Sequence, residues 1–359
     1  MLFKKYLVIV PGIILAFVLY ALSQGLNNII GIELLGYAKS PISTAMIAIL
    51  MGIVLGNIFQ IREGFLLGID FTQKYILKLG IIFLGIQLKP FEFLKFGTVA
   101  IPLIIICIIS VLIVVKLLIK KLKISTRMAY LISIGSTVCG TTAIIATAPI
   151  IKANKGEVAY AIANMTVFGI ISMLIYPYFA NIYFGNDPMF VGLFLGTAIH
   201  ETSQVAAAGL IYDQQYNSPE TLNFATVTKL IRNTFLVIMI PLFAFLYNRN
   251  TTKTKNYSLI NIFPYFVLGF IGMIIFRNMG DEIFLTEYSQ PMWQSVVSNV
   301  KESAKILLSM AMAAVGLSTN LKDLKLMGYK PFIVGFIAMI TVGFVSIITI
   351  QLFRSLYSI

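Results

Sequence analysis

The 359-residue sequence carries little charge. Only 11% of its residues are Asp, Glu, Lys or Arg, whereas 58% are hydrophobic and the mean hydropathy is +0.91. Soluble domains have about 25% charged residues, and a soluble fold of this composition would expose large apolar patches to water. The composition therefore excludes a water-soluble enzyme, a disordered chain and a nucleic-acid-binding protein, and it indicates a polytopic membrane protein.

Metal ligands, thiols and phosphate-binding loops are also scarce. One histidine and two cysteines, Cys107 and Cys139, can form neither a multi-histidine metal site nor a disulfide framework. The chain has no G-x-x-x-x-G-K-[ST] loop, and Gln204 stands where the second histidine of an H-E-x-x-H motif beginning at His200 would be. We therefore expect no cofactor, no metal and no enzymatic activity.

The net charge of +13 lies in short basic runs between apolar blocks. Lys4, Lys5 and basic runs within 116–127, 249–255 and 322–330 contrast with an acidic loop at 278–290. Cytoplasmic loops of membrane proteins carry an excess of Lys and Arg. The pattern predicts a multi-pass membrane protein with a cytoplasmic N-terminus.

Eleven apolar runs approach the roughly 20 residues that cross a bilayer. They lie near 7–24, 41–59, 73–88, 98–118, 128–151, 157–180, 188–211, 221–247, 258–277, 300–319 and 331–353. The first is expected to be an uncleaved helix. Lys152 and Lys155 disagree with this topology, because eleven full spans would place them on the non-cytoplasmic side of the membrane. Either full but broken spans tolerate them, which we favour, or 128–151 and 188–211 are re-entrant hairpins.

Two halves of the chain show weak sequence similarity to each other. Leu55-Gly56-Asn57 corresponds to Leu195-Gly196-Thr197, and inverted repeats are common in secondary transporters. We predict an all-α fold with about eleven transmembrane helices. It would comprise an additional N-terminal helix and loop at 1–40, a first inverted five-helix repeat at 41–184 and a second at 185–359. Each repeat would contain one discontinuous helix.

Glycines and hydroxyls at mid-membrane indicate where the helices break. Residues 135–142 read Gly-Ser-Thr-Val-Cys-Gly-Thr-Thr, and 316–320 read Gly-Leu-Ser-Thr-Asn. Irregular backbone is tolerated at that depth where it lines a cavity, and its free N–H groups suit an anion; close helix packing through small residues is the alternative. The predicted substrate-binding residues are Gly135, Ser136, Thr137, Gly140, Thr141, Thr142, Arg232, Asn233, Ser318 and Asn320.

Ionisable residues inside apolar spans are costly and usually functional. His200, Ser203 and Gln204 share one helical face, and Glu201 lies beside them. An imidazole that changes charge near neutral pH suits proton coupling. A packing or capping role for His200 is the alternative. These four residues, with Lys229, are the predicted ion-coupling residues, for a proton or a sodium ion.

Basic side chains also occur inside the next span. Lys229, Arg232 and Asn233 share one helical face. A buried guanidinium can bind an oxyanion through two parallel hydrogen bonds. The alternative is that Arg232 neutralises Glu201, which would leave no net charge for a substrate.

Three motifs carry a resemblance to a known family. They are Gly135-Ser-Thr-Val-Cys-Gly-Thr-Thr-Ala143, Gly196-Thr-Ala-Ile-His-Glu-Thr-Ser-Gln-Val205 and Lys229-Leu-Ile-Arg-Asn233. The chain resembles the YeiH-like family of bacterial inner-membrane proteins, labelled sulfate exporters, over nearly its whole length. The resemblance implies a secondary transporter related to the cation/proton antiporter and anion transporter superfamily, with inverted five-helix repeats and two broken helices that cross near the midplane.

These features together predict a secondary transporter that moves a small anion, such as a sulfur oxyanion or an organic anion, by alternating access. Its partners would be the anion, a coupling proton or sodium ion and the lipid bilayer, with a homodimer left open. The first alternative is a cation/proton antiporter in which Glu201 binds the cation. An intramembrane enzyme using His200 and Glu201 and an uncoupled channel are the others.

Overall fold

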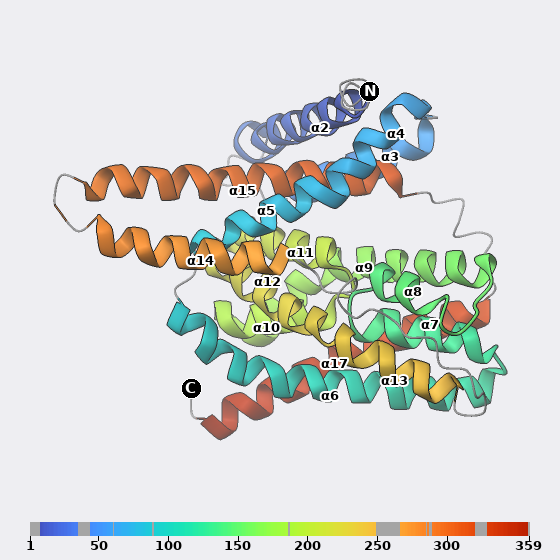
Figure 1. Ribbon diagram of the computed structural model, residues 1–359. Coiled ribbons are helices and arrows are strands. Elements are labelled where there is room, and N and C mark those ends of the chain that lie inside the picture. Colours follow the sequence, from blue (N-terminus) through green and yellow to red (C-terminus); the bar gives the residue numbers. More distant parts are fainter. Residues whose placement is uncertain are drawn as a thin grey trace. The chain divides into compact units, whose positions relative to one another are not determined.

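The computed structural model describes most of the chain as helix. The described residues are 8–34, 44–59, 61–87, 90–185, 187–248, 266–284, 286, 289–319 and 329–357. Within these ranges every regular element is helical and no strand occurs, as predicted (Figure 1). Five helices are long and apolar enough to cross a membrane: Val10–Asn28, Phe96–Ile119, Gly156–Phe184, Pro219–Tyr247 and Tyr329–Ser355. The eleven-span count and the inverted repeats remain predictions.

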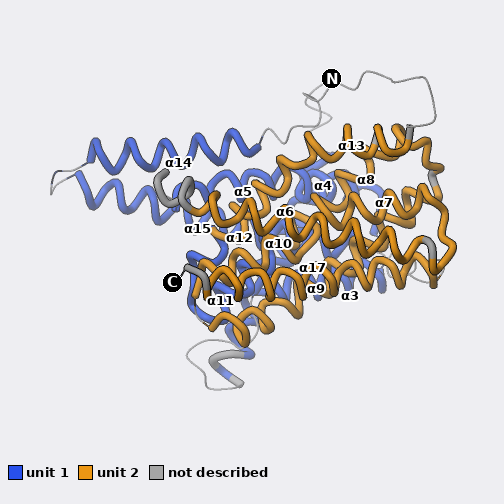
Figure 2. The backbone as a smooth tube through the Cα atoms, turned by 90° about the horizontal axis from the view of Figure 1, so that it is seen from below, with its two compact units in different colours: residues 1–94, 206–223, 265–321 blue, residues 95–205, 224–264, 322–359 orange. Residues whose placement is uncertain are grey.

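The chain folds into two compact units, each built from three stretches of sequence (Figure 2). Unit 1 comprises residues 1–94, 206–223 and 265–321, and unit 2 comprises residues 95–205, 224–264 and 322–359. Both units therefore combine segments from both of the predicted repeats.

Unit 1 packs its helices through glycine. Its elements are α2 (Val10–Asn28), η1 (Ile29–Leu34), α3 (Thr44–Ile58), α4 (Glu63–Phe71), η2 (Thr72–Ile76), α5 (Leu77–Leu84), η3 (Gly85–Gln87), most of α11 (Thr202–Tyr216), the start of α12 (Pro219–Thr234), α14 (Phe266–Ile283) and α15 (Gln290–Ser318). A Cβ on Gly52 of α3 would lie 2.5 Å from the carbonyl oxygen of Ala313 on α15, and one on Gly12 of α2 would lie 2.6 Å from Gly68 of α4. Small residues allow this close approach of helix backbones in membranes.

Unit 2 is arranged around two long parallel helices. Its elements are most of α6 (Pro90–Leu122), then α7 (Thr126–Thr137), α8 (Thr141–Thr147), α9 (Lys155–Phe184), α10 (Pro188–Ala198), the first residues of α11 (Thr202–Tyr216), most of α12 (Pro219–Thr234), α13 (Leu236–Asn248) and α17 (Tyr329–Tyr357). Hydrogen bonds join Asn164 to Pro331, Tyr176 to Met339 and Gln351 to Tyr183. From one bonded pair to the next, the residue numbers increase along both helices, so α9 and α17 run in the same direction.

The first broken segment is a hairpin. The chain reverses between α7 and α8, where Gly140 adopts a φ of +60° and its N–H donates to the Gly135 carbonyl at 3.0 Å. Ser125, immediately before α7, donates to Glu157 in the first turn of α9 at 3.0 Å. Residues 126–154 therefore return to the end at which they enter. The expectation that 128–151 crosses fully is wrong, and Lys152 lies at the same end as the basic run at 116–127.

The second broken segment also reverses. Gly192 and Gly196 of α10 pack on Phe224 and Thr228 of α12, so these two helices run in the same direction. Only residues 217–218 separate α11 from α12, and Gly209 packs on Leu222, so α11 runs opposite to α12 and therefore to α10. The segment 188–211 is thus a hairpin too, and the favoured full span is wrong here as well.

The two hairpins enter unit 2 from opposite ends. The α7–α8 hairpin begins beside the start of α9. In α10, by contrast, Phe194 contacts Phe184 at the end of α9 with ring centroids 5.8 Å apart, and the Phe190 ring lies 5.7 Å from the guanidinium of Arg354, near the end of α17. Their tips, Val138–Gly140 and Ile199–Glu201, consequently meet between the ends of the unit.

Cysteine labelling tests the first hairpin. Lys123 and Lys152 are exposed, whereas the native Cys107 and Cys139 are buried and should be unreactive. We expect Lys123→Cys and Lys152→Cys to react with a membrane-impermeant maleimide from the same side of sealed vesicles. Labelling from opposite sides would contradict the hairpin.

Candidate functional site

A glutamate joins the tips of the two hairpins. The carboxylate oxygen Oε2 of Glu201 accepts hydrogen bonds from the backbone N–H of Thr141, at 3.0 Å, and from its hydroxyl, at 3.1 Å. Thr141 is the first residue of α8, so the carboxylate lies at the positive end of this short helix. A Cβ on Gly140 would overlap the Glu201 carboxylate, which explains why glycine occupies this position.

Lys229 holds both tips through backbone oxygens. Its ammonium, fully buried, donates to the carbonyls of Val138 at 2.8 Å and Ile199 at 3.1 Å, and also to that of His200. An ammonium has three N–H donors. All three are therefore engaged, and each accepting carbonyl lies at or just beyond the C-terminal end of α7 or α10.

Arg232 holds the same helix ends one turn further along α12. Its Nε donates to the Thr137 carbonyl at 2.9 Å, and Nη1 donates to the carbonyls of Thr197 at 2.6 Å and Ile199 at 3.0 Å. Nη2 donates to the Ser136 carbonyl. A guanidinium has five N–H donors, so one remains, and the side chain cannot offer a substrate two parallel hydrogen bonds in this conformation.

These bonds explain how a broken helix is tolerated here. The last four carbonyls of a helix have no intrahelical partner, and the helix end carries about half a negative charge. Two such ends meet in unit 2, and the two cations of α12 lie against both. Among the described residues no carboxylate lies within 4 Å of either cation, and Glu201 is the only acidic side chain that contacts the tips. Counted by formal charge, the cluster thus has two cations and one anion.

The other predicted coupling residues lie around α11. The His200 ring is fully buried, and neither ring nitrogen has a hydrogen-bond partner. Gln204 donates to the Thr166 carbonyl at 3.3 Å, while its buried Oε1 has no partner. Ser203, by contrast, is only half-buried. The side chains of His200 and Gln204 are thus enclosed, whereas those of Glu201 and Ser203 are partly accessible.

The predicted substrate residues separate into enclosed and accessible groups. Gly135, Ser136 and Thr137 are buried. Ser136 and Thr137 present carbonyl oxygens to Arg232, the Thr137 hydroxyl bonds within α7, and the Gly135 carbonyl accepts from the Gly140 N–H. Thr141 is half-buried and Thr142 exposed. Asn233 donates to the Thr202 hydroxyl at 3.1 Å, and its buried Oδ1 has no partner.

The remaining two predicted residues are Ser318 and Asn320. Ser318 belongs to unit 1, where its hydroxyl donates to the Ala314 carbonyl at 3.0 Å and accepts from Gln73. Asn320 lies outside the described residues. The placement of both in a substrate site remains a prediction.

Some residues of the site were not predicted from the sequence, because they contribute only backbone atoms. Val138, Thr197 and Ile199 supply carbonyl oxygens to the two cations, and side-chain chemistry gives no signal for that. Thr202 was also missed, although a hydroxyl directly after His200 and Glu201 was a readable signal.

Comparisons with known proteins agree on one group of membrane proteins. A family model described as conserved hypothetical protein 698 matches residues 11–335, a range that contains both hairpins and α12. A UPF0324 membrane protein of Fusobacterium nucleatum is 36% identical over 305 residues, covering 83% of this chain and 88% of the relative. Others, from Streptococcus agalactiae and Clostridium tetani, are 35% and 31% identical and cover 93% and 96% of this chain and 94% and 96% of their own lengths.

Removing one buried cation should destabilise unit 2. Lys229→Met leaves the carbonyls of Val138 and His200 without a donor, whereas that of Ile199 keeps its bond from Arg232. We therefore expect a loss on the order of 3 kcal/mol, read as a lower melting temperature in detergent. Lys121→Met is the control, because Lys121 is exposed and should change stability by about 0.5 kcal/mol or less. Equal melting temperatures for the two variants would contradict the structural role of Lys229.

Proposed function

The chain belongs to the family of UPF0324 membrane proteins, described as conserved hypothetical protein 698, and from this premise we propose that it is a secondary active transporter that moves a small anion across the bacterial inner membrane by alternating access. The observation that carries the proposal is the meeting of two broken hairpins at a buried cluster with excess positive charge. Secondary transporters commonly place their substrates at such half-helix ends.

The charge balance favours an anion. Two C-terminal and two N-terminal helix ends meet at the tips, so their partial charges of about half a unit each roughly cancel. Lys229 and Arg232 then exceed Glu201 by one charge. An uncompensated charge inside a membrane protein is costly. A bound monoanion would compensate it.

Donors for the anion would come from the start of α11. Lys229 has no free donor and Arg232 only one, so both act on the anion chiefly through their charge. The first N–H groups of a helix have no intrahelical partner and bind anions well. The accessible hydroxyls of Thr202 and Ser203 lie at this same helix start.

Glu201 is the proposed site of the coupling ion. It is the partly accessible charged group at the tips, and its carboxylate joins α8 to the α10–α11 hairpin. A proton or a sodium ion on this carboxylate would weaken its bonds to Thr141. Ion binding would thereby change how firmly the hairpins are held together, which is what coupling requires. The enclosed His200 ring remains a second candidate for the proton.

The same accessible carboxylate favours a second candidate, a cation/proton antiporter. In that protein Glu201 would bind the transported cation, and Lys229 and Arg232 would only hold the backbone. The two functions differ in what stabilises the folded protein, because a ligand that binds the folded state raises its melting temperature.

A ligand screen distinguishes the two. We expect purified protein to be stabilised by one or more small oxyanions or carboxylates, with shifts that grow with anion concentration and change with pH. Sodium or lithium chloride matched for ionic strength is the control. Stabilisation by sodium with no response to any anion would contradict anion transport and support the antiporter.

Replacing Glu201 tests coupling separately from binding. Glutamine can still accept the Thr141 hydrogen bonds, but it has no negative charge to hold a sodium ion and no proton to exchange. Glu201→Gln should therefore keep anion-induced stabilisation while gradient-driven uptake in proteoliposomes falls at least tenfold. Exposed Glu63→Gln is the control. Uptake by Glu201→Gln that still follows the proton or sodium gradient would place coupling elsewhere.

A further inference from the structure

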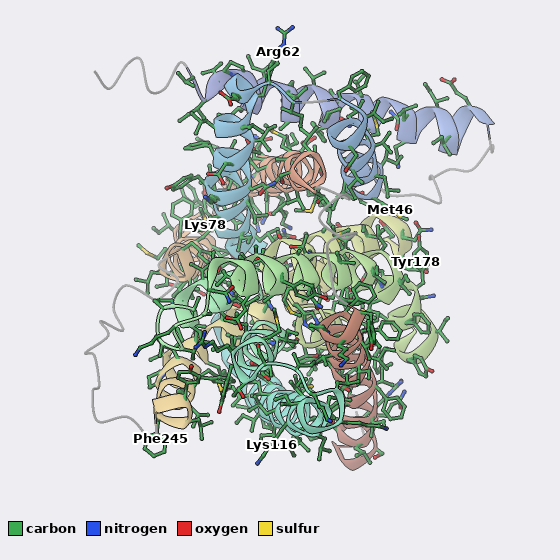
Figure 3. The ribbon with its side chains drawn as sticks, turned by 90° about the vertical axis from the view of Figure 1, so that its right-hand side faces the viewer. Met46, Arg62, Lys78, Lys116, Tyr178 and Phe245 are labelled. Carbon is green, nitrogen blue, oxygen red and sulfur yellow. The ribbon has the colours of Figure 1, made fainter. Side chains whose placement is uncertain are left out.

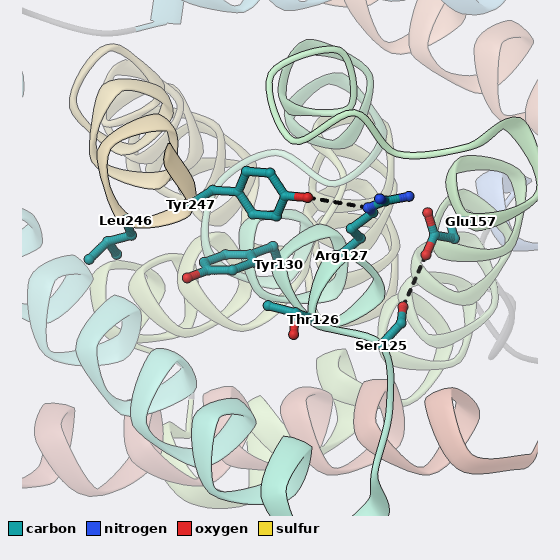
Figure 4. Close-up of a pocket in the computed structure, with 7 residues that line it drawn as sticks. All are labelled: Ser125, Thr126, Arg127, Tyr130, Glu157, Leu246 and Tyr247. Carbon is teal, nitrogen blue, oxygen red and sulfur yellow. Dashed lines mark hydrogen bonds between the residues drawn. The ribbon is translucent and has the colours of Figure 1, made fainter. Parts of the chain in front are cut away.

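A pocket lies at the base of the first hairpin. It has a volume of about 490 Å³, and its lining includes Ser125, Arg127, Tyr130, Glu157, Leu246 and Tyr247 (Figure 4). These residues come from the start of α7, the start of α9 and the last turn of α13, all within unit 2. The basic run at 116–127 places this end of unit 2 on the predicted cytoplasmic side.

Opposite charges are held apart in this pocket. The Arg127 Nε donates to the Tyr247 hydroxyl at 3.2 Å, which fixes the guanidinium and leaves its two terminal nitrogens for a ligand. The Glu157 carboxylate accepts from the Ser125 hydroxyl and the Asn154 N–H, each at 3.0 Å. Arg127 and Glu157 do not form an ion pair within 4 Å. Figure 4 shows Arg127 between Tyr247 and Glu157.

An apolar surface adjoins the pocket along α13. Its exposed side chains, Ile238, Leu242, Phe245 and Leu246, follow a helical spacing of four, three and one residues and form one stripe. Phe245 is 66% exposed and points outward from unit 2 (Figure 3). The Tyr130 and Tyr247 rings pack edge to face with centroids 5.9 Å apart, and tyrosines of this kind are enriched at membrane–water interfaces.

We propose that this pocket binds the headgroup of a phospholipid that carries a phosphate and a primary ammonium, as phosphatidylethanolamine does. The phosphate would bind the fork of terminal nitrogens of Arg127, which suits an oxyanion. The ammonium would bind the Glu157 carboxylate, and the acyl chains would lie along the α13 stripe.

Other phospholipids fit the two charges less well. An anionic lipid with a glycerol headgroup offers Arg127 a phosphate but brings no cation to Glu157. A choline headgroup brings a cation that has no N–H to donate. The pocket therefore selects the primary ammonium through Glu157, while Arg127 binds the phosphate that all three share. The proposal is independent of which substrate the hairpin tips bind.

Delipidated full-length protein provides the test. We expect phosphatidylethanolamine, added in detergent, to raise the melting temperature and to bind at least tenfold more tightly in native mass spectrometry than phosphatidylglycerol or phosphatidylcholine of the same acyl composition. Soluble phosphoethanolamine should bind far more weakly, because it lacks the chains that lie on α13.

Two variants separate the headgroup contacts. Glu157→Gln should lose the preference for phosphatidylethanolamine yet stay folded, because glutamine can replace glutamate in the capping box with Asn154. Arg127→Gln should weaken binding of all three lipids, and Arg62→Gln, at an exposed position in unit 1 (Figure 3), should change nothing.

Three outcomes would overturn the proposal. The first is equal or tighter binding of phosphatidylglycerol by the unaltered protein. The second is an unchanged lipid preference in Glu157→Gln. The third is binding of soluble phosphoethanolamine as tight as that of the lipid, which would point to a free zwitterion.

Discussion

Two cations of α12 hold the C-terminal ends of two half-helices, and unit 2 depends on this interaction. Lys229 and Arg232 donate seven hydrogen bonds to backbone carbonyls at the hairpin tips. Without those donors, several peptide oxygens would be buried with no partner, at a cost of about 1–3 kcal/mol each. Their negative helix ends would also face each other. The cations relieve both costs and thereby permit irregular backbone in the interior of unit 2.

The hydrogen bonds of Lys229 and Arg232 to the backbone also determine which groups remain to bind a ligand. Because Lys229 and Arg232 direct nearly all of their donors to the backbone, they keep their charge but have little capacity to contact a ligand. The accessible chemistry lies instead on Glu201, Thr202 and Ser203. In the proposed transporter, the charge that would attract an anion is therefore separate from the groups that would touch it. The Glu201 carboxylate, bound to Thr141, links the hairpins to each other and is where we propose that the coupling ion binds.

The sequence predicted the class and the helical fold. Of the tip residues it singled out Gly140, His200 and Glu201 but not Val138 or Ile199, and it did not show how these residues are used. Apolar composition and the glycine and hydroxyl runs were local signals, and they correctly indicated helices interrupted near Gly140. Lys152 and Lys155 were the local clues against a full span, and the contact between Ser125 and Glu157 shows that they were informative. Arg232 as an oxyanion clamp was a reasonable prediction from its chemistry. Its actual partners are carbonyls contributed by two distant segments.

By itself, the sequence determined that this chain is a helical membrane protein with ionisable residues inside its apolar helices. It could do so because a chain that folds in lipid must have long apolar runs, and these can be read from composition alone. Only the tertiary structure decided that 128–151 and 188–211 turn back and meet, because reversal depends on backbone geometry at Gly140 and Ile199 and on donors from α12. It also decided which charged groups are enclosed and which are accessible. The low charge of the chain identifies it as a membrane protein, and the carbonyls that surround Lys229 and Arg232 determine what these two residues do.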